Sequence, residues 1–238
     1  MVQDATGNFT GLKSSLANAL RLDPKHRRAR LMLASQNVRD KKFEEALTTA
    51  TLLEQDFPNG IDAHILQSKV LMQLKRESEA VAALERAQKV APKSEIPVIE
   101  MAKLRFFAGQ NDLGFKALKS WLQANPNNIR ANAFLAESYL AFKKNDEALE
   151  AYKKIATIEP ENLIALNNIA NLLGDKDPKL ALPYAEKAYA SYPVDPAIAD
   201  TLGWLLVRTG DEKRGLDLIK KAVDVAPGSP DIQFHYAF

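Results

Sequence analysis

A proline recurs along this chain at an almost constant interval. Five of the six gaps between successive members of the series are 34 residues long, and the remaining gap, between Pro160 and Pro193, is 33. A period of this length indicates one supersecondary unit copied in series. Stacked units of this kind build an extended surface that holds a partner, which favours binding over catalysis. The prolines of the series are Pro24, Pro58, Pro92, Pro126, Pro160, Pro193 and Pro227.

Each unit contains two apolar patterns with helical spacing. In the stretch 129–160 the first pattern ends at Leu140, and the polar run 143–146 interrupts it before a second pattern begins at Ala148. The recurring spacing of three and four residues predicts two amphipathic helices. Because proline cannot continue a helix and biases the preceding residue away from helical angles, it closes the unit. We therefore expect an all-α fold of helix, short turn and antiparallel helix.

Small residues recur at one position of the first helices and at one of the second. Two helices approach closely only where small side chains leave room, so both columns predict helix crossings. The first column is Ala34, Ser68, Ala102, Ala136, Ala170 and Gly203, and the second is Ala46, Ala80, Gly114, Ala148, Ala181 and Gly215.

The period divides the chain into one continuous solenoid over residues 1–238. We expect a partial repeat at 11–26, six full repeats and a truncated repeat at 230–238. The apolar side chains of the truncated repeat are unlike a polar terminal cap. This predicts either a fragment of a longer repeat protein or a homodimer that packs through this end. The full repeats are 27–60, 61–94, 95–128, 129–162, 163–195 and 196–229, and the uncapped side chains are Ile232, Phe234, Tyr236 and Phe238.

Composition excludes several classes of function. The 32 basic and 30 acidic residues give a net charge of only +2, which argues against a sequence-independent nucleic-acid binder. The chain has no cysteine, and therefore no disulfide, thiolate metal site or cysteine nucleophile. We find no apolar run long enough to span a bilayer and no signal-peptide pattern at the start. Catalytic and phosphate-loop motifs are absent, so we expect neither an enzyme nor a bound cofactor.

These features resemble those of the tetratricopeptide repeat (TPR) family over nearly the whole length of the chain. The fourth unit carries the large, small, aromatic and proline positions of the family pattern, in that order. The resemblance implies a right-handed superhelix of antiparallel helix pairs that binds a protein or peptide in a concave groove. The matching residues are Leu135, Ala136, Tyr139, Ala148, Tyr152 and Pro160 in the fourth unit, and Leu202, Gly203, Gly215, Ala222 and Pro227 in the sixth.

The family's groove positions, carried over to this sequence, give a candidate ligand-binding patch. The asparagines can donate to and accept from a peptide backbone, and Trp204 offers an aromatic platform. Two alternatives remain open: the asparagines also match the family's average sequence, and Trp204 can pack between repeats. Basic residues are missing where a chaperone-type carboxylate clamp needs them, at Ala197 and Thr201. The patch is Arg130, Glu137, Asn167, Asn168, Asn171, Asp200, Trp204 and Arg208.

A narrower resemblance covers about forty residues near the C-terminal end. The stretches 200–204, 226–232 and 235–237 are similar to bacterial cell-envelope TPR proteins, above all the TPR lipoprotein that accompanies exosortase (PEP-CTERM) sorting and exopolysaccharide export. This narrower resemblance implies a scaffold that is periplasmic or anchored to the outer membrane. If the resemblance does not hold, a cytoplasmic location is the alternative. Two further functions remain open, namely the substrate-recognition arm of a larger enzyme such as a glycosyltransferase and a self-assembling structural module.

Overall fold

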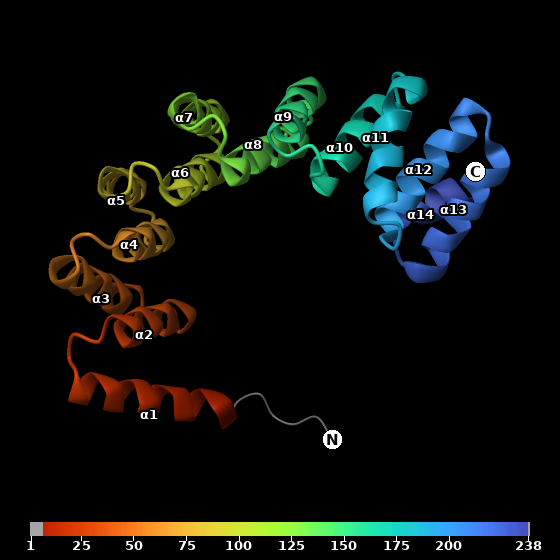
Figure 1. The fold of residues 1–238 in the computed structure, drawn as a ribbon. Coiled ribbons are helices and arrows are strands. Elements are labelled where there is room, and N and C mark those ends of the chain that lie inside the picture. The colour runs from red at the N-terminus through yellow and green to blue at the C-terminus, as the bar shows by residue number, and fades with distance from the viewer. Residues whose placement is uncertain (1–6, 238) are drawn as a thin grey trace. The chain divides into compact units, whose positions relative to one another are not determined.

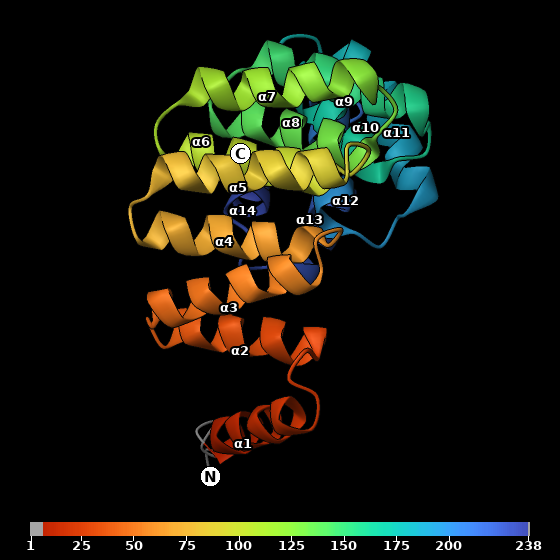
Figure 2. The same ribbon diagram turned by 90° about the vertical axis from the view of Figure 1, so that its left-hand side faces the viewer.

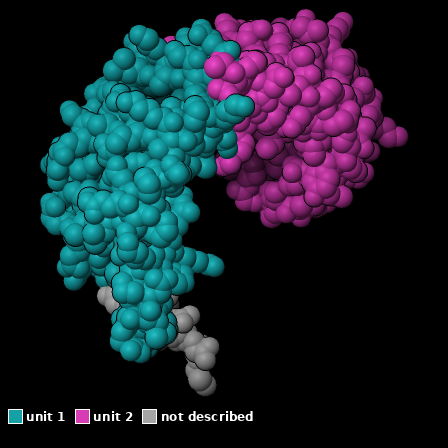
Figure 3. Space-filling view, turned by 60° about the vertical axis from the view of Figure 1, so that its left-hand side comes forward, with its two compact units in different colours: residues 1–123 teal, residues 124–238 magenta. Residues whose placement is uncertain are grey.

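The computed structural model describes residues 7–237, and within them every regular element is an α-helix (Figure 1). The expected all-α repeat solenoid is confirmed. The chain divides into two compact units, residues 1–123 and 124–238, shown in different colours in Figure 3. The continuous solenoid over 1–238 stays a prediction, and Phe238 lies outside the described residues.

Unit 1 is a stack of antiparallel helices in chain order (Figure 2). Each of the helices α1 to α5 packs on the next, and the rings of Phe106 in α6 and Phe115 in α7 meet edge-on. Helix α2 also contacts α4, and α4 contacts α6, so first helices of successive repeats are neighbours. Helix α1 begins at Gly7, four residues before the start of the partial repeat that the sequence predicts at 11–26. The helices are α1 Gly7–Leu22, α2 Arg27–Arg39, α3 Phe43–Asp56, α4 Ile61–Gln73, α5 Glu77–Val90, α6 Glu95–Phe107 and α7 Asn111–Ala124.

Unit 2 repeats the same arrangement. Successive helices from α8 to α14 pack on one another, and the first helices α10, α12 and α14 are in contact along the chain order. The helices are α8 Ile129–Ala141, α9 Asn145–Ile158, α10 Leu163–Gly174, α11 Pro178–Ser191, α12 Pro196–Thr209, α13 Glu212–Val225 and α14 Pro230–Ala237.

The proline series ends the second helices as the sequence predicts. Each of these helices ends two residues before its proline, as α3 does at Asp56 before Pro58. The residue between them leaves helical angles; Phe57 has φ −133° and ψ 65°, and Glu159 has φ −126° and ψ 87°. Steric exclusion of the α region before proline explains this common end. Pro183, in contrast, lies inside α11, which continues through it to Ser191.

Both predicted columns of small residues are buried. Their alanines have exposures of 0%, and Ser68 is 3% exposed. The two glycines of the sixth repeat face each other, because a Cβ built on Gly203 would lie 2.8 Å from the carbonyl oxygen of Gly215. The columns therefore mark the places where the paired helices come closest.

The turns inside the repeats contain a left-handed residue at one position. Lys41, Lys75 and Lys143 have φ near 60°, and Gly109 and Gly210 have φ of 73° and 102°. The fifth repeat has one residue fewer, and its turn after Gly174 passes Asp175 in the right-handed region before the Asp177 N-cap. A side chain in the left-handed region costs about 1 kcal/mol that glycine avoids.

Replacing Lys143 by glycine should therefore stabilise the protein by about 0.5–1 kcal/mol, because the strain of φ 57° disappears. Urea denaturation followed by circular dichroism measures the change. Lys143→Ala is the matched control, since it removes the same side chain and keeps the Cβ that causes the strain. Equal stability of the two variants would show that the turn carries no strain at this residue.

Candidate functional site

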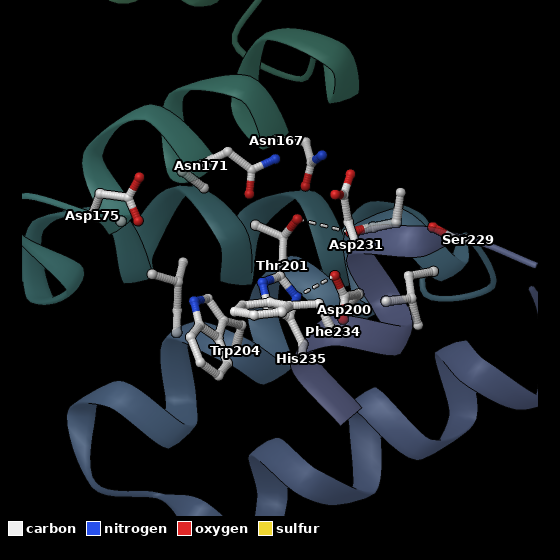
Figure 4. Close-up of a pocket in the computed structure, with 15 residues that line it drawn as sticks. Asn167, Asn171, Asp175, Asp200, Thr201, Trp204, Ser229, Asp231, Phe234 and His235 are labelled. Carbon is white, nitrogen blue, oxygen red and sulfur yellow. Dashed lines mark hydrogen bonds and ion pairs between the residues drawn. The ribbon is translucent and has the colours of Figure 1, made fainter. Parts of the chain in front are cut away.

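Three first helices of unit 2 enclose a pocket of about 380 Å³ (Figure 4). Helix α10 supplies Asn167 and Asn171, α12 supplies Asp200 and Trp204, and α14 supplies His235. The three helices converge because each repeat places its first helix beside that of the preceding repeat. The other lining residues are Ala170, Gly174, Asp175, Ala197, Thr201, Leu205, Ser229, Asp231, Ile232 and Phe234.

An aromatic cluster forms one part of the pocket wall. The rings of Trp204 and His235 stack with their centroids 4.4 Å apart and an interplanar angle of 14°. Phe234 meets Trp204 edge-on, with centroids 6.4 Å apart. Trp204 therefore packs against α14 and also lines the pocket. The two roles considered for Trp204, a ligand platform and packing between repeats, are compatible.

Two buried oxygen atoms in the pocket have no hydrogen-bond partner within the protein. They are Asn167 Oδ1 and Asp200 Oδ1. Asp200 is only 4% exposed, and its other oxygen, Oδ2, lies 2.8 Å from His235 Nδ1. An unsatisfied buried acceptor is costly, and native structures contain few of them. Both atoms therefore lack a hydrogen-bond donor within the protein.

The predicted patch divides into residues that line the pocket and residues that do not. Asn167, Asn171, Asp200 and Trp204 line it. Asn168 instead donates to the carbonyl oxygen of Ile164 in its own helix, at 2.8 Å. Asn168 does not line the pocket.

Arg208 takes a structural position at the end of α10. Its Nη1 donates to the carbonyl oxygen of Gly174 at 2.6 Å, and it lies 3.5 Å from the carboxylate of Asp175. A cation at a helix C-terminus satisfies orphan carbonyl groups and complements the helix dipole. Arg208 thus holds α10 next to α12 and does not line the pocket.

Arg130 and Glu137 lie on α8 and are exposed, and neither lines this pocket. Glu137 acts on a neighbour in the core. Burial and, second, the negative charge of Glu137 raise the pKa of Tyr152 to about 12. The role of Arg130 and Glu137 as ligand contacts stays a prediction.

The raised pKa of Tyr152 gives a pH-dependent stability. An unfolded tyrosine titrates near pH 10. Because the folded pKa is higher, this contribution to stability is fully present below about pH 10 and is lost as the pH rises toward 12. Tyr152→Phe should therefore lose less stability than the wild type between about pH 9 and pH 11.5 in urea denaturation. Tyr192→Phe, at an exposed tyrosine, should follow the wild type.

Sequence reasoning misses the part that α14 plays in the site. His235 belongs to no catalytic motif and receives no predicted role, and Phe234 is predicted only as part of an uncapped end. The sequence nevertheless contains a usable signal. His235 lies 34 residues after Thr201, so it occupies the equivalent first-helix position in the next repeat, and Thr201 directly follows Asp200. In residues 7–237, no cluster of three or more potential metal ligands occurs, and no helix has the length and apolarity to cross a bilayer.

Comparison with known proteins finds tetratricopeptide repeats within this chain. One tetratricopeptide repeat model matches residues 61–94, and a second matches residues 106–171. Both of these stretches are tetratricopeptide repeats. A curated relative, the TPR repeat-containing protein PA4667 of Pseudomonas aeruginosa, is 29% identical in an alignment of 177 residues that covers 70% of this chain. The chain spans only 30% of the length of that relative.

Solved structures support the TPR fold. The structure of pilF from Pseudomonas aeruginosa aligns with a TM-score of 0.60 at 16% identity, covering 89% of this chain and 96% of that one. A chain of the APC/C hetero-tetramer Cut9–Hcn1 aligns with a TM-score of 0.56 at 10% identity, covering 98% of this chain and 46% of that one. Repeats of this architecture present extended surfaces for protein–protein interaction.

Proposed function

We propose that this chain is a non-catalytic scaffold that binds a peptide segment of a partner protein in the pocket of α10, α12 and α14. One observation carries the proposal: two buried acceptors, Asn167 Oδ1 and Asp200 Oδ1, lack partners inside a pocket beside an aromatic ring. A peptide supplies N–H donors for such atoms from its backbone and from its side chains. The exposed amide of Asn171 adds a donor and an acceptor at the same surface.

The test is affinity capture from a lysate of the source organism with three baits, each first shown to be folded by thermal unfolding. They are the wild type, the double variant Asn171→Ala/Trp204→Ala and the control Phe107→Ala. Phe107 is 84% exposed in unit 1, where it lines a separate pocket of about 210 Å³. We expect a partner that the wild type and the Phe107 variant retain and the double variant loses. A partner lost only with Phe107→Ala would place binding in unit 1 and contradict the proposal.

We extend the proposal to the setting of a bacterial cell-envelope assembly for exopolysaccharide or protein sorting. Its support is the narrower sequence resemblance of residues 200–237, and the curated relative is itself bacterial. Identification of the captured partner tests this setting, and a partner from an unrelated cytoplasmic process would contradict it.

Self-association through α14 is a second candidate. Phe234 and Tyr236 are 61% and 48% exposed on this helix, while Ile232 is buried beneath it. Exposed aromatic side chains of this kind favour an interface. Sedimentation velocity should show a concentration-dependent mass that Tyr236→Ser abolishes; a constant monomer mass would remove this candidate.

A further inference from the structure

The pocket of unit 2 is lined by acidic and neutral side chains. Three carboxylates, those of Asp175, Asp200 and Asp231, come from three different structural segments and lie around the same space (Figure 4). Among the described residues that line it, none is a lysine or arginine. Arg208, which contacts the lining residues Gly174 and Asp175, does not itself line the pocket. The lining therefore presents negative charge that is only partly balanced.

The burial of Asp200 distinguishes the pocket lining from a group of acidic residues at the protein surface. Its side chain is 6% exposed, which removes most of the water that would stabilise a carboxylate. His235 contacts only Oδ2, and Oδ1 has no partner in the protein. A buried carboxylate is stabilised when each oxygen receives a donor, and charged donors do so best. Asn167 Oδ1 is a second acceptor without a donor in the same pocket.

The aromatic wall suits the stem of a long cationic side chain. Trp204 and Phe234 line the pocket beside Asp200. Lysine and arginine lay their methylene groups along apolar surface while the charged end seeks acceptors. A cation over an indole gains a further attraction, and a guanidinium also stacks on such rings. A peptide's terminal amine has no comparable stem to fill this volume.

We infer that the pocket binds a lysine or arginine side chain of the partner peptide, with the cation donating to Asp200 Oδ1 and Asn167 Oδ1. This inference rests on the proposed function and names the chemistry of its ligand. The carboxylates of Asp175 and Asp231 lie farther out, since both residues are exposed, and they attract the cation as it approaches.

The experiment selects peptides from a randomised display library on the full chain and measures their affinity by fluorescence polarisation. The selected peptides are remade with N-terminal acetyl groups and with each basic residue replaced by glutamine. They are measured against the wild type, Asp200→Asn, Asp231→Asn and the control Asp224→Asn. Asp224 is an exposed residue of α13 outside the pocket, so its variant matches the change in net charge. Thermal unfolding confirms that all four proteins are folded.

We expect one basic position in the selected peptides. Its replacement by glutamine, and Asp200→Asn, should each weaken binding by about thirtyfold or more, because a buried charge pair is broken. Asp231→Asn should weaken it about threefold at low salt and less at high salt. Asp224→Asn should leave it unchanged.

Other outcomes separate the two proposals. Peptides that bind in the Trp204 pocket without a basic residue would overturn the cation inference and leave peptide binding intact. Binding that acetylation abolishes would assign the pocket to a terminal amine and overturn the side-chain assignment. Recovery of no peptide, together with no partner in the lysate capture, would overturn both.

Discussion

Replacing Gly215 by alanine should destabilise the protein by about 1–3 kcal/mol, although alanine is the better helix former. A Cβ at this position would lie 2.6 Å from the carbonyl oxygen of Gly203 and 2.7 Å from Cγ2 of Val207. The backbone oxygen belongs to a packed helix and cannot rotate away as a side chain can. The helices α12 and α13 must therefore separate, and their shared core loosens.

Chemical denaturation monitored by circular dichroism measures this loss. Gly228→Ala is the matched control, because a Cβ at Gly228 meets nothing within 4 Å and its φ is not in the left-handed region. That variant should stay within about 0.5 kcal/mol of the wild type. If Gly215→Ala is as stable as the control, the helices do not cross at the two glycines.

Tyr152→Ala should cause the larger loss, about 3–5 kcal/mol. Tyr152 is 1% exposed in α9 and is among the largest fully buried side chains. Its truncation removes an aromatic ring from the core of the fourth repeat and leaves a cavity. Helix α9 contacts both α8 and α10, so the cavity weakens two helix pairs.

The control is Tyr192→Ala, which makes the same chemical change at a residue that is 48% exposed. It should alter the free energy of unfolding by no more than about 0.5 kcal/mol. A loss below about 1 kcal/mol for Tyr152→Ala would show that the surrounding helices collapse into the space, and would contradict a rigid fourth repeat.

Gly215 and Tyr152 also show how far sequence reasoning reaches in a repeat protein. Their positions in the unit, one at a crossing and one in the core, follow from the period alone. The period is informative because the same structural environment recurs in every repeat. A small residue at the same position of each repeat is explained by the close approach of two helices. The proline series fixes the helix ends for a similar reason, since its steric effect on the preceding residue is local.

The candidate site follows from the sequence only in part. The groove positions carried over from the TPR family include Asn167, Asn171, Asp200 and Trp204, and the structure brings these four residues to one pocket. Helical position does not settle what a side chain bonds to, however. Asn168 donates to Ile164 in its own helix, and Arg208 binds the end of α10. These outcomes depend on side-chain torsions and on the distance to the next helix.

The sequence by itself determined the helix pairs, their ends at the prolines and the two columns of small residues where the helices cross. These features follow from short-range sterics and from a repeated apolar pattern. The tertiary structure alone decided that His235 stacks on Trp204 and contacts Asp200, and that one oxygen of Asp200 stays without a partner. Such a site forms from side chains of three helices about 34 residues apart, and only their packing brings those atoms within hydrogen-bonding distance.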